Sequence, residues 1–256
     1  MTPADVDFIV VGTTTPDLIF PNTGTLLQQR LDIHGCPAFS LETACSGFIY
    51  ALSIADKYVR VRRIEVRARG RRRVPVAFRG LDRSRDGRAL GDGAGAVILT
   101  PADEPGIIGT HLHSDGKYQD LLYFPYGVSN GIRHAAQQLD CDGLKMQGNE
   151  VFKVAVRTLS RTRGRDAREE RDRAQRNRLA CPHQANLRII QSAADKLGLP
   201  MEKVVVTVQD HGNTSAASIP LALDTAVRDG RIHRDQLLLL ETFGGGFTWG
   251  SALIRY

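Results

Sequence analysis

The chain of 256 residues has no apolar run as long as the roughly 18 residues that a membrane-spanning helix requires. Residues 1–11 contain Asp5 and Asp7 but no basic residue, so they do not have the pattern of a secretory signal peptide. Hydrophobic residues make up 42% and charged residues 24%, which excludes general disorder and low-complexity chains. We therefore expect a folded, cytoplasmic protein with no membrane partner.

Cysteine is also scarce, with four residues at positions 36, 45, 141 and 181. They form no CxxC pair, and no combination of cysteine and histidine has the spacing of a zinc site. The sequence thus predicts neither disulfides nor a bound metal. A buried, unreactive thiol is the default interpretation of each cysteine unless its surroundings argue otherwise.

The net charge of +6 comes from two arginine-rich windows, residues 60–88 and 157–178, which hold 21 of the 28 arginines. The windows carry net charges of +9 and +5, so the rest of the chain has a net charge of −8. Neither window has a clear apolar repeat of helical or strand period. Because the chain outside the windows is acidic, a nucleic-acid partner is not expected.

Three interpretations of the windows remain open: a solvated basic arm, a phosphate-binding patch whose affinity would fall with salt, and a shifted reading frame. Codons for residues 75–90 can be chosen so that the next frame reads LSRFVDSTDRATAVL, and codons for residues 162–181 so that it reads LVEETLAKNGIERSEIDWLV. The second string has the pattern of a helix, a turn and a strand. We favour the shifted frame, which predicts that the chain as written aggregates or is cleaved within the windows.

Outside the windows, strand and helix patterns alternate, as in an α/β protein. Strands are expected within residues 6–15, 36–45, 95–99, 203–208, 236–241 and 243–255. Helices are expected at residues 23–31, 46–59, 149–159, 186–197 and 218–228. Prolines at 101 and 105 mark a boundary between an N-terminal half, residues 1–104, and a C-terminal half, residues 105–256.

Three short segments carry candidate chemistry. Cys45 lies in TACSGF at a strand-to-helix turn, where the positive end of the helix dipole would favour a thiolate nucleophile, and a packed thiol is an equal alternative. His183 lies in PHQAN before a helix, and a structural histidine is the alternative. Asn213 lies in HGNTSAAS, where a turn or N-cap residue is the alternative. Each segment is a weak signal by itself.

Together with GDGAG at residues 91–95 and FGGGFTWG at residues 243–250, these segments resemble the β-ketoacyl-acyl-carrier-protein synthase III family. The likeness includes GNEVFKVAVRTL and LLETFGGGFTWGSALIRY and covers nearly all of the chain outside the windows. It implies a thiolase-like α/β fold, with two similar halves in a five-layer αβαβα arrangement, and a homodimer.

The resemblance implies an acyltransferase that condenses an acyl-CoA primer, with acetyl-CoA expected, with malonyl-acyl-carrier protein at the start of type II fatty acid synthesis. Cys45 would be the nucleophile that takes the acyl group. His183 and Asn213 would stabilise the enolate that forms when the malonyl group loses CO₂. The backbone N–H groups of Cys45 and Gly245 would form the oxyanion hole, and no permanently bound cofactor is implied.

Further positions follow from the same resemblance. The residues assigned to binding of CoA or the acyl chain are Gly148, Phe152, Ala185, Asn186 and Phe20, of which Phe20 would reach into the partner subunit's pocket. Lys153 and Arg188 are assigned to contacts with the acidic acyl carrier protein, with an ordinary solvated charge as the alternative.

The chain also departs from the family. It starts at the strand before TTTPD, so the family's leading β/α segment, with a tryptophan and an arginine that bind CoA, has no counterpart in it. The first window replaces a core strand and another CoA-contacting arginine, and the second replaces the helix and strand that lead to His183. An inactive or truncated condensing-enzyme remnant, or a basic nucleic-acid-binding protein, remains an alternative, and the choice of primer stays open.

Overall fold

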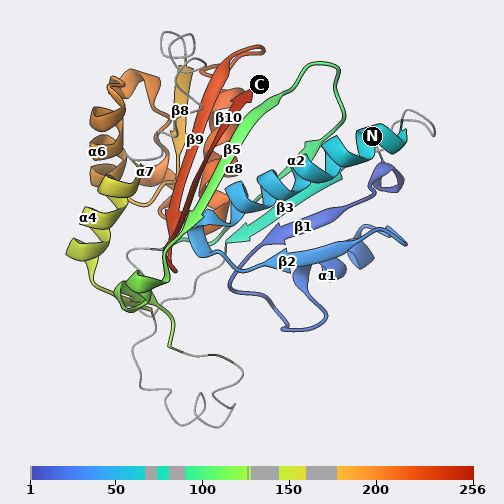
Figure 1. The fold of residues 1–256 in the computed structure, drawn as a ribbon, viewed down its shortest axis with the longest axis horizontal. Helices are drawn as coiled ribbons and strands as arrows, with labels where there is room; N and C mark the ends of the chain where they lie inside the picture. Colours follow the sequence, from blue (N-terminus) through green and yellow to red (C-terminus); the bar gives the residue numbers. More distant parts are fainter. Residues whose placement is uncertain (1, 67–73, 81–89, 126, 128–143, 160–177) are drawn as a thin grey trace.

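The structure is a computed structural model that describes residues 2–66, 74–80, 90–125, 127, 144–159 and 178–256, with residues 62–66, 74–80 and 178 described by their backbone alone (Figure 1). The elements before residue 104 are η1 Pro3–Asp5, β1 Ile9–Gly12, α1 Thr23–Arg30, β2 Ala38–Leu41, η2 Ala44–Ser46, α2 Gly47–Val66, β3 Val74–Gly80 and β4 Gly93–Leu99. The elements that follow are β5 Ile107–Ser114, η3 Gly116–Leu121, β6 Leu122–Tyr123, β7 Lys145–Met146, α4 Gly148–Leu159, β8 Arg178–Pro182, α6 Leu187–Leu197, η6 Met201–Lys203, α7 Val208–His211, η7 Ser215–Ala217, α8 Ser218–Arg228, β9 Leu237–Gly244 and β10 Thr248–Arg255.

Two four-stranded sheets, in the orders β2-β1-β3-β4 and β5-β10-β9-β8, form the framework. In the first sheet β1 runs parallel to β2 and β3, and β4 is antiparallel to β3. In the second, β8 is parallel to β9, and β10 is antiparallel to both β9 and β5. Each sheet thus joins parallel strands to an antiparallel pair.

Helices α2 and α8 lie between the sheets, because each of them contacts strands of both. α1 packs on β1 and β2, whereas α4 and α6 pack on each other at the side of the second sheet (Figure 1). The main core joins buried side chains of β1, α2, α8 and β9, including Val10, Phe48, Ile219 and Leu240, none of which is more than 1% exposed. The result is five alternating layers of helix and sheet.

The strand β4 is an edge of the first sheet and has no partner strand on its outer side among the described residues. A cavity of about 860 Å³ opens beside β4, and it is lined by residues of η1, β1, α1 and β4. This cavity therefore lies on the side of the first sheet that α1 covers only in part.

The sequence-based expectations for most elements are confirmed, and local capping explains where helices begin and end. The Asn186 side chain accepts a hydrogen bond from the Ile189 backbone N–H at 3.0 Å, so α6 begins directly after it. Gly198, with a φ of 64°, ends the same helix in the left-handed conformation that glycine favours. The expected helix at residues 218–228 matches α8 over its full length.

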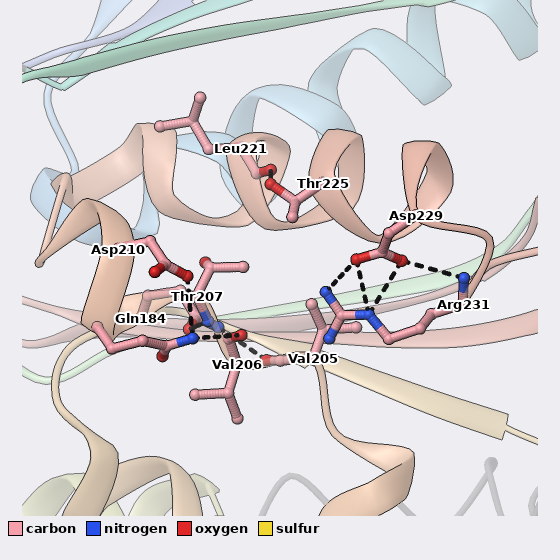
Figure 2. Close-up of polar contacts among 10 residues, drawn as sticks. Gln184, Val205, Val206, Thr207, Asp210, Leu221, Thr225, Asp229 and Arg231 are labelled. Carbon is pink, nitrogen blue, oxygen red and sulfur yellow. Dashed lines mark hydrogen bonds and ion pairs between the residues drawn. The ribbon is translucent and has the colours of Figure 1, made fainter.

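The strand expected at residues 203–208 is wrong. These residues form only one bridge to the second sheet, between Val204 and Ala180. Beyond the bridge, the Gln184 side chain bonds the Val205 carbonyl at 3.0 Å and accepts a hydrogen bond from the Thr207 N–H at 2.8 Å (Figure 2). A side-chain amide thus takes the place of a neighbouring strand, and no ladder forms.

The expectation that the arginine-rich windows lack core elements is wrong for the parts that the structure describes. α2 continues to Val66, and Val74–Gly80 forms β3 between β1 and β4. Val74, Val76 and Phe78 in β3 are residue types that favour strands, whereas Pro75 has no backbone N–H to donate to a neighbouring strand. The strand that leads to His183 is also present, as β8. Residues 67–73, 81–88 and 160–177 lie outside the described residues.

Candidate active site

Cys45 lies in the turn that joins β2 to α2, as the sequence predicts. Ala44, just before it, has a φ of 43°, so the backbone turns sharply and Cys45 sits within the short helical turn η2 that leads into α2. The Thr242 hydroxyl donates a hydrogen bond to the Cys45 carbonyl at 2.9 Å, and the Ser46 hydroxyl donates to the Thr248 carbonyl at 3.0 Å. The second sheet therefore holds the backbone of the thiol-bearing turn in place.

Gly244, at the end of β9, allows this close approach. A Cβ atom at Gly244 would lie 2.9 Å from the Cys45 backbone nitrogen and 3.1 Å from the Ser46 nitrogen, so no larger residue fits without a backbone shift. A Cβ atom at Gly245, the predicted oxyanion-hole residue, would lie 3.3 Å from the Leu122 carbonyl oxygen and 3.8 Å from the Ala44 Cβ. Both glycines thus bring the β9–β10 turn against the thiol-bearing turn.

His183 follows β8 and is only 7% exposed. Its backbone N–H donates to the Glu241 carbonyl at 2.7 Å, which continues the pairing of β8 with β9 by one residue. Burial lowers the pKa of the His183 imidazole to about 4, because removal from water disfavours the charged form. The imidazole is therefore neutral near pH 7 and has one ring N–H that can donate a hydrogen bond.

The segment of residues 213–218 includes Asn213 and contacts the other two candidate catalytic residues, Cys45 and His183. The Asn213 side-chain oxygen accepts a hydrogen bond from the Ser215 N–H at 3.0 Å, which confirms the expected turn and leaves the amide NH₂ group as a donor. The Ser215 hydroxyl lies 3.4 Å from Cys45 Sγ, and the Ser218 hydroxyl lies 2.6 Å from His183 Nδ1. A thiol, an imidazole and an amide from three separate regions of the chain are thus tied to one short segment.

The other two described cysteines, Cys36 and Cys181, have contacts typical of packed, structural thiols. Cys181 is fully buried, its thiol lies 3.8 Å from the Ile219 carbonyl, and burial raises its pKa to about 12. Cys36 lies 3.2 Å from the Gln28 side-chain nitrogen. None of the three described cysteines forms a disulfide, and the part of the chain that the structure describes holds no cluster of potential metal ligands. No helix among the described residues is long and apolar enough to cross a membrane.

The residues assigned to CoA and the carrier protein fall mainly on α4 and α6. Gly148 is the exposed first residue of α4, and Phe152 follows one turn later, where the Arg188 guanidinium lies 5.5 Å from its ring centre. Lys153 is exposed and forms an ion pair with Glu150 at 2.7 Å. The structure therefore brings Phe152 and Arg188 together and leaves both cations at the surface.

Of the three remaining predicted residues, two follow His183 closely in the chain and the third, Phe20, lies in a different part of the structure. Ala185 lines a cavity of about 20 Å³ beside His183, and Asn186 is the exposed cap of α6. Phe20 lies between β1 and α1 with 85% of its surface exposed, next to the exposed Ile19 and Leu18. The structure does not bring Phe20 against the other candidate residues of this chain.

Four residues at the site were not singled out from the sequence: Gln184, Ser215, Ser218 and Gly244. Ser215 and Ser218 lie within HGNTSAAS, and Gln184 lies within PHQAN, so the motifs contained them. Ser218 contacts Gln184 across 34 positions and Ser215 contacts Cys45 across 170, and spacing along the chain does not reveal such contacts.

Comparisons with known proteins agree with this geometry. The protein-family model described as 3-Oxoacyl-[acyl-carrier-protein (ACP)] synthase III C terminal matches residues 174–256. A β-ketoacyl-[acyl-carrier-protein] synthase III from Alkalilimnicola ehrlichii is 54% identical over 266 residues, which cover 99% of this chain and 78% of the relative. Its counterpart from Xylella fastidiosa is 53% identical over 261 residues, which cover 99% of this chain and 77% of the relative.

Solved structures lead to the same assignment. The 3-oxoacyl-[acyl-carrier-protein] synthase III of Aquifex aeolicus superposes with a TM-score of 0.83 at 37% identity, covering all of this chain and 79% of that one. The corresponding enzyme of Pseudomonas aeruginosa gives a TM-score of 0.80 at 34% identity, covering 98% of this chain and 77% of that one. The chain therefore has the thiolase-like fold and belongs to the β-ketoacyl-acyl-carrier-protein synthase III family.

Proposed function

We propose that this chain catalyses the decarboxylative condensation of an acyl-CoA primer, acetyl-CoA in the first instance, with malonyl-acyl-carrier protein, to give a β-ketoacyl-acyl-carrier protein at the start of type II fatty acid synthesis. The observation that carries the proposal is the link of Cys45, His183 and Asn213 through residues 213–218. Acyl-CoA and malonyl-acyl-carrier protein are both substrates of this acyltransferase, and the chemistry needs no resident cofactor.

In the first half-reaction, the Cys45 thiolate attacks the carbonyl carbon of acyl-CoA. A bond forms between Sγ and the acyl carbon, the negative charge moves to the carbonyl oxygen, and the CoA thiolate leaves as the carbonyl re-forms. The Cys45 and Gly245 N–H groups serve as donors to that oxygen. Proximity to the N-terminal end of α2 and to the Ser215 hydroxyl at 3.4 Å favours the thiolate form of Cys45.

In the second half-reaction, the bond between the malonyl carboxylate and its α-carbon breaks, and CO₂ leaves. The electron pair passes into an enolate whose charge lies on the thioester oxygen, where the His183 imidazole and the Asn213 amide donate hydrogen bonds. The α-carbon then attacks the acyl group on Cys45 and expels the Cys45 thiolate. Neutral donors suit this step, and the lowered pKa of His183 supports its neutral form.

The substrates approach, in this proposal, along the face of α4 and α6. Phe152, Gly148, Ala185 and Asn186 bind the CoA or carrier-protein arm, while Lys153 and Arg188 attract the acidic carrier protein. The exposure of both cations and the contact of Arg188 with Phe152 support this assignment. Exposed charge of this kind increases association rates more than it increases affinity.

We further propose that the protein is a cytoplasmic homodimer whose two halves, residues 1–104 and 105–256, each build one sheet. Phe20, which is 85% exposed, is the proposed contact with the partner subunit's acyl pocket. Strands β1 to β4 belong to one sheet and β5, β8, β9 and β10 to the other, which supports the division. Neither nucleic acid nor membrane is a partner in this proposal.

Incubation with radiolabelled acetyl-CoA tests the role of Cys45. We expect one label per chain on Cys45 by peptide mapping, and no stable label in Cys45→Ser. Cys36→Ser is the matched control, because Cys36 is also partly buried but packs against Ile9, Val11 and Ile33 and bonds Gln28, and it should retain full labelling. Label on Cys36, Cys141 or Cys181 instead of Cys45 would overturn the assignment.

Decarboxylation of malonyl-acyl-carrier protein separates the two half-reactions. His183→Ala and Asn213→Ala should each lower its rate by about 100- to 1000-fold, the usual loss for one donor to a developing oxyanion. Both variants should still take the label on Cys45, because neither side chain takes part in that step. A variant that decarboxylates at the normal rate removes its residue from the proposed role.

A further inference from the structure

We propose that Ser218 is a positioning residue that keeps the proton of neutral His183 on Nε2. The inference rests on the proposed role of His183 as a hydrogen-bond donor and adds to it the group that makes the imidazole a donor. Its basis is the 2.6 Å separation between Ser218 Oγ and His183 Nδ1, at a site where both side chains are buried.

The direction of this hydrogen bond follows from the other partner of Ser218. The Gln184 backbone N–H donates to Ser218 Oγ at 3.2 Å, so the hydroxyl oxygen already accepts one hydrogen bond. Among the described residues, His183 Nδ1 is the one acceptor within reach of the Ser218 hydroxyl proton. Buried hydroxyl protons are rarely left unused. The hydroxyl therefore donates to Nδ1, and Nδ1 accepts with its lone pair.

The groups around this hydrogen bond are held firmly. Ser218 is the first residue of α8 and is 2% exposed. Gln184 is 1% exposed, and its side-chain nitrogen donates to the Pro182 carbonyl at 2.8 Å. The same nitrogen donates to the Val205 carbonyl at 3.0 Å (Figure 2). The Gln184 N–H consequently has a fixed direction toward Ser218, and it orients the hydroxyl toward the imidazole.

The consequence for the chemistry concerns the second ring nitrogen. A neutral imidazole carries one proton, so an accepting Nδ1 requires the proton on Nε2. Nε2–H can then donate to the thioester oxygen on which enolate charge develops. In the other tautomer, Nε2 would present a lone pair to that oxygen and repel the charge. Ser218 thus determines which of the two forms of His183 is present.

Nitrogen-15 NMR of protein labelled at histidine tests the tautomer directly and without catalysis. We expect the His183 Nδ1 signal at the downfield position of an unprotonated ring nitrogen and the Nε2 signal at the position of a protonated one, near pH 7. The His183→Gln spectrum identifies the signals by their disappearance. A protonated Nδ1 in the unaltered protein would overturn the proposal, whatever the activity.

Kinetics of Ser218→Ala test the functional consequence. The variant should decarboxylate malonyl-acyl-carrier protein at least about tenfold more slowly, less than the loss expected when the donor is removed outright. The loss should fall on kcat with KM unchanged, and acylation of Cys45 should be retained. Ser218→Thr keeps the hydroxyl and should recover most of the rate and the original nitrogen-15 signals.

A matched control separates positioning from general packing. Ser53 is also a buried helical serine, and its hydroxyl lies 2.8 Å from the Thr110 hydroxyl, away from His183. Ser53→Ala should leave the rate of decarboxylation unchanged. An equal loss of rate in both alanine variants, or normal decarboxylation by Ser218→Ala, would overturn the inference. If the unaltered protein failed to decarboxylate at all, the proposed function would fail, while the NMR measurement would still decide the tautomer.

Discussion

His183 links the pH of the solution to the stability of the fold. Burial lowers its pKa to about 4, whereas the same group titrates near 6.5 in an unfolded chain. Between these values the unfolded state binds a proton that the folded state does not, so the free energy of unfolding decreases as the pH falls. For this one group, the decrease between about pH 7 and pH 5 is about 2 kcal/mol.

Urea unfolding at pH 7 and pH 5 measures this effect. His183→Gln should remove about 2 kcal/mol of the pH dependence, because glutamine does not titrate in this range. Ser53→Ala is the control, since it replaces a buried side chain that does not titrate in this range and should leave the pH dependence unchanged. If the His183 variant keeps the full pH dependence, another group is responsible for it.

Replacement of Gly244 should affect both the stability of the fold and the acylation of Cys45. In Gly244→Ala, the new methyl group would lie 2.9 Å from the Cys45 nitrogen, so the backbone of β9 or of the thiol-bearing turn must move. We expect a loss of about 1–3 kcal/mol in the free energy of unfolding, as for overpacked cores. Acylation of Cys45 should also slow markedly, because its N–H is one of the proposed oxyanion donors.

Denaturant unfolding and acyl-CoA labelling measure the two effects of Gly244→Ala. Gly109→Ala is the matched control in another strand, where a Cβ atom would meet nothing within 4 Å. The control should keep both the stability and the labelling rate. Equal labelling rates in the two alanine variants would contradict the importance of the close approach.

At the scale of single elements, Gln184 replaces a missing strand partner. Its amide nitrogen donates to the Pro182 carbonyl. The amide also donates to the Val205 carbonyl and accepts from the Thr207 N–H (Figure 2), and all three residues are buried. Gln184→Leu would leave these backbone groups without partners, at a cost of about 1–3 kcal/mol for each group that water cannot reach. We therefore expect a strongly destabilised variant whose decarboxylation fails before its Cys45 labelling does.

The matched control is Gln209→Leu, because Gln209 also bonds a backbone carbonyl, that of Val206, but is exposed. Thermal unfolding followed by circular dichroism should show a much smaller change for Gln209→Leu than for Gln184→Leu. Similar changes in both variants would mean that the buried amide is not what holds residues 204–207.

The same element shows the limits of sequence patterns. KVVVTV has the β-branched composition of a strand. The Gln184 side chain nevertheless bonds the Val205 carbonyl, which a neighbouring strand would otherwise bond. The spacing of apolar residues in the sequence does not predict this side-chain contact. Helices with a clear cap, such as α6 after Asn186, were predictable to within a residue. The strand β3 was missed because arginines on both sides of VPVAF concealed its apolar pattern.

The site was predictable in its motifs but not in its contacts. TACSGF, PHQAN and HGNTS were each weak signals, and only their combined resemblance to the family indicated the candidates Cys45, His183 and Asn213. The contact of Ser218 with His183 spans 35 positions and depends on how α8 packs against β8. The structure, but not the sequence, shows that Ser215 contacts Cys45 and that Ser218 contacts His183.

At the scale of the whole molecule, the exposed residues Leu18, Ile19 and Phe20 support the proposed dimer. An apolar side chain that is 85% exposed, beside two others, is unusual at the surface of a monomer. Phe20→Glu should therefore weaken the dimer by at least about tenfold, as expected when a charge enters an apolar contact. Sedimentation equilibrium over a range of protein concentrations measures the dissociation constant.

Val61→Glu is the control for the dimer, because Val61 is a single exposed apolar residue on α2 with 66% of its surface exposed. It should leave the dissociation constant unchanged. A monomer at all concentrations in the unaltered protein, or equal dissociation constants in both variants, would refute the proposed role of Phe20.

The segment of residues 213–218 has a consequence for the interpretation of any variant of this protein. Its Ser215 contacts the nucleophile of the first half-reaction, and its Asn213 and Ser218 belong to the second. A change that acts on one catalytic group should alter one half-reaction alone, whereas a change that displaces the segment should slow both in parallel. The ratio of the acylation rate to the decarboxylation rate therefore distinguishes local chemical effects from movement of the scaffold, even for substitutions far from Cys45.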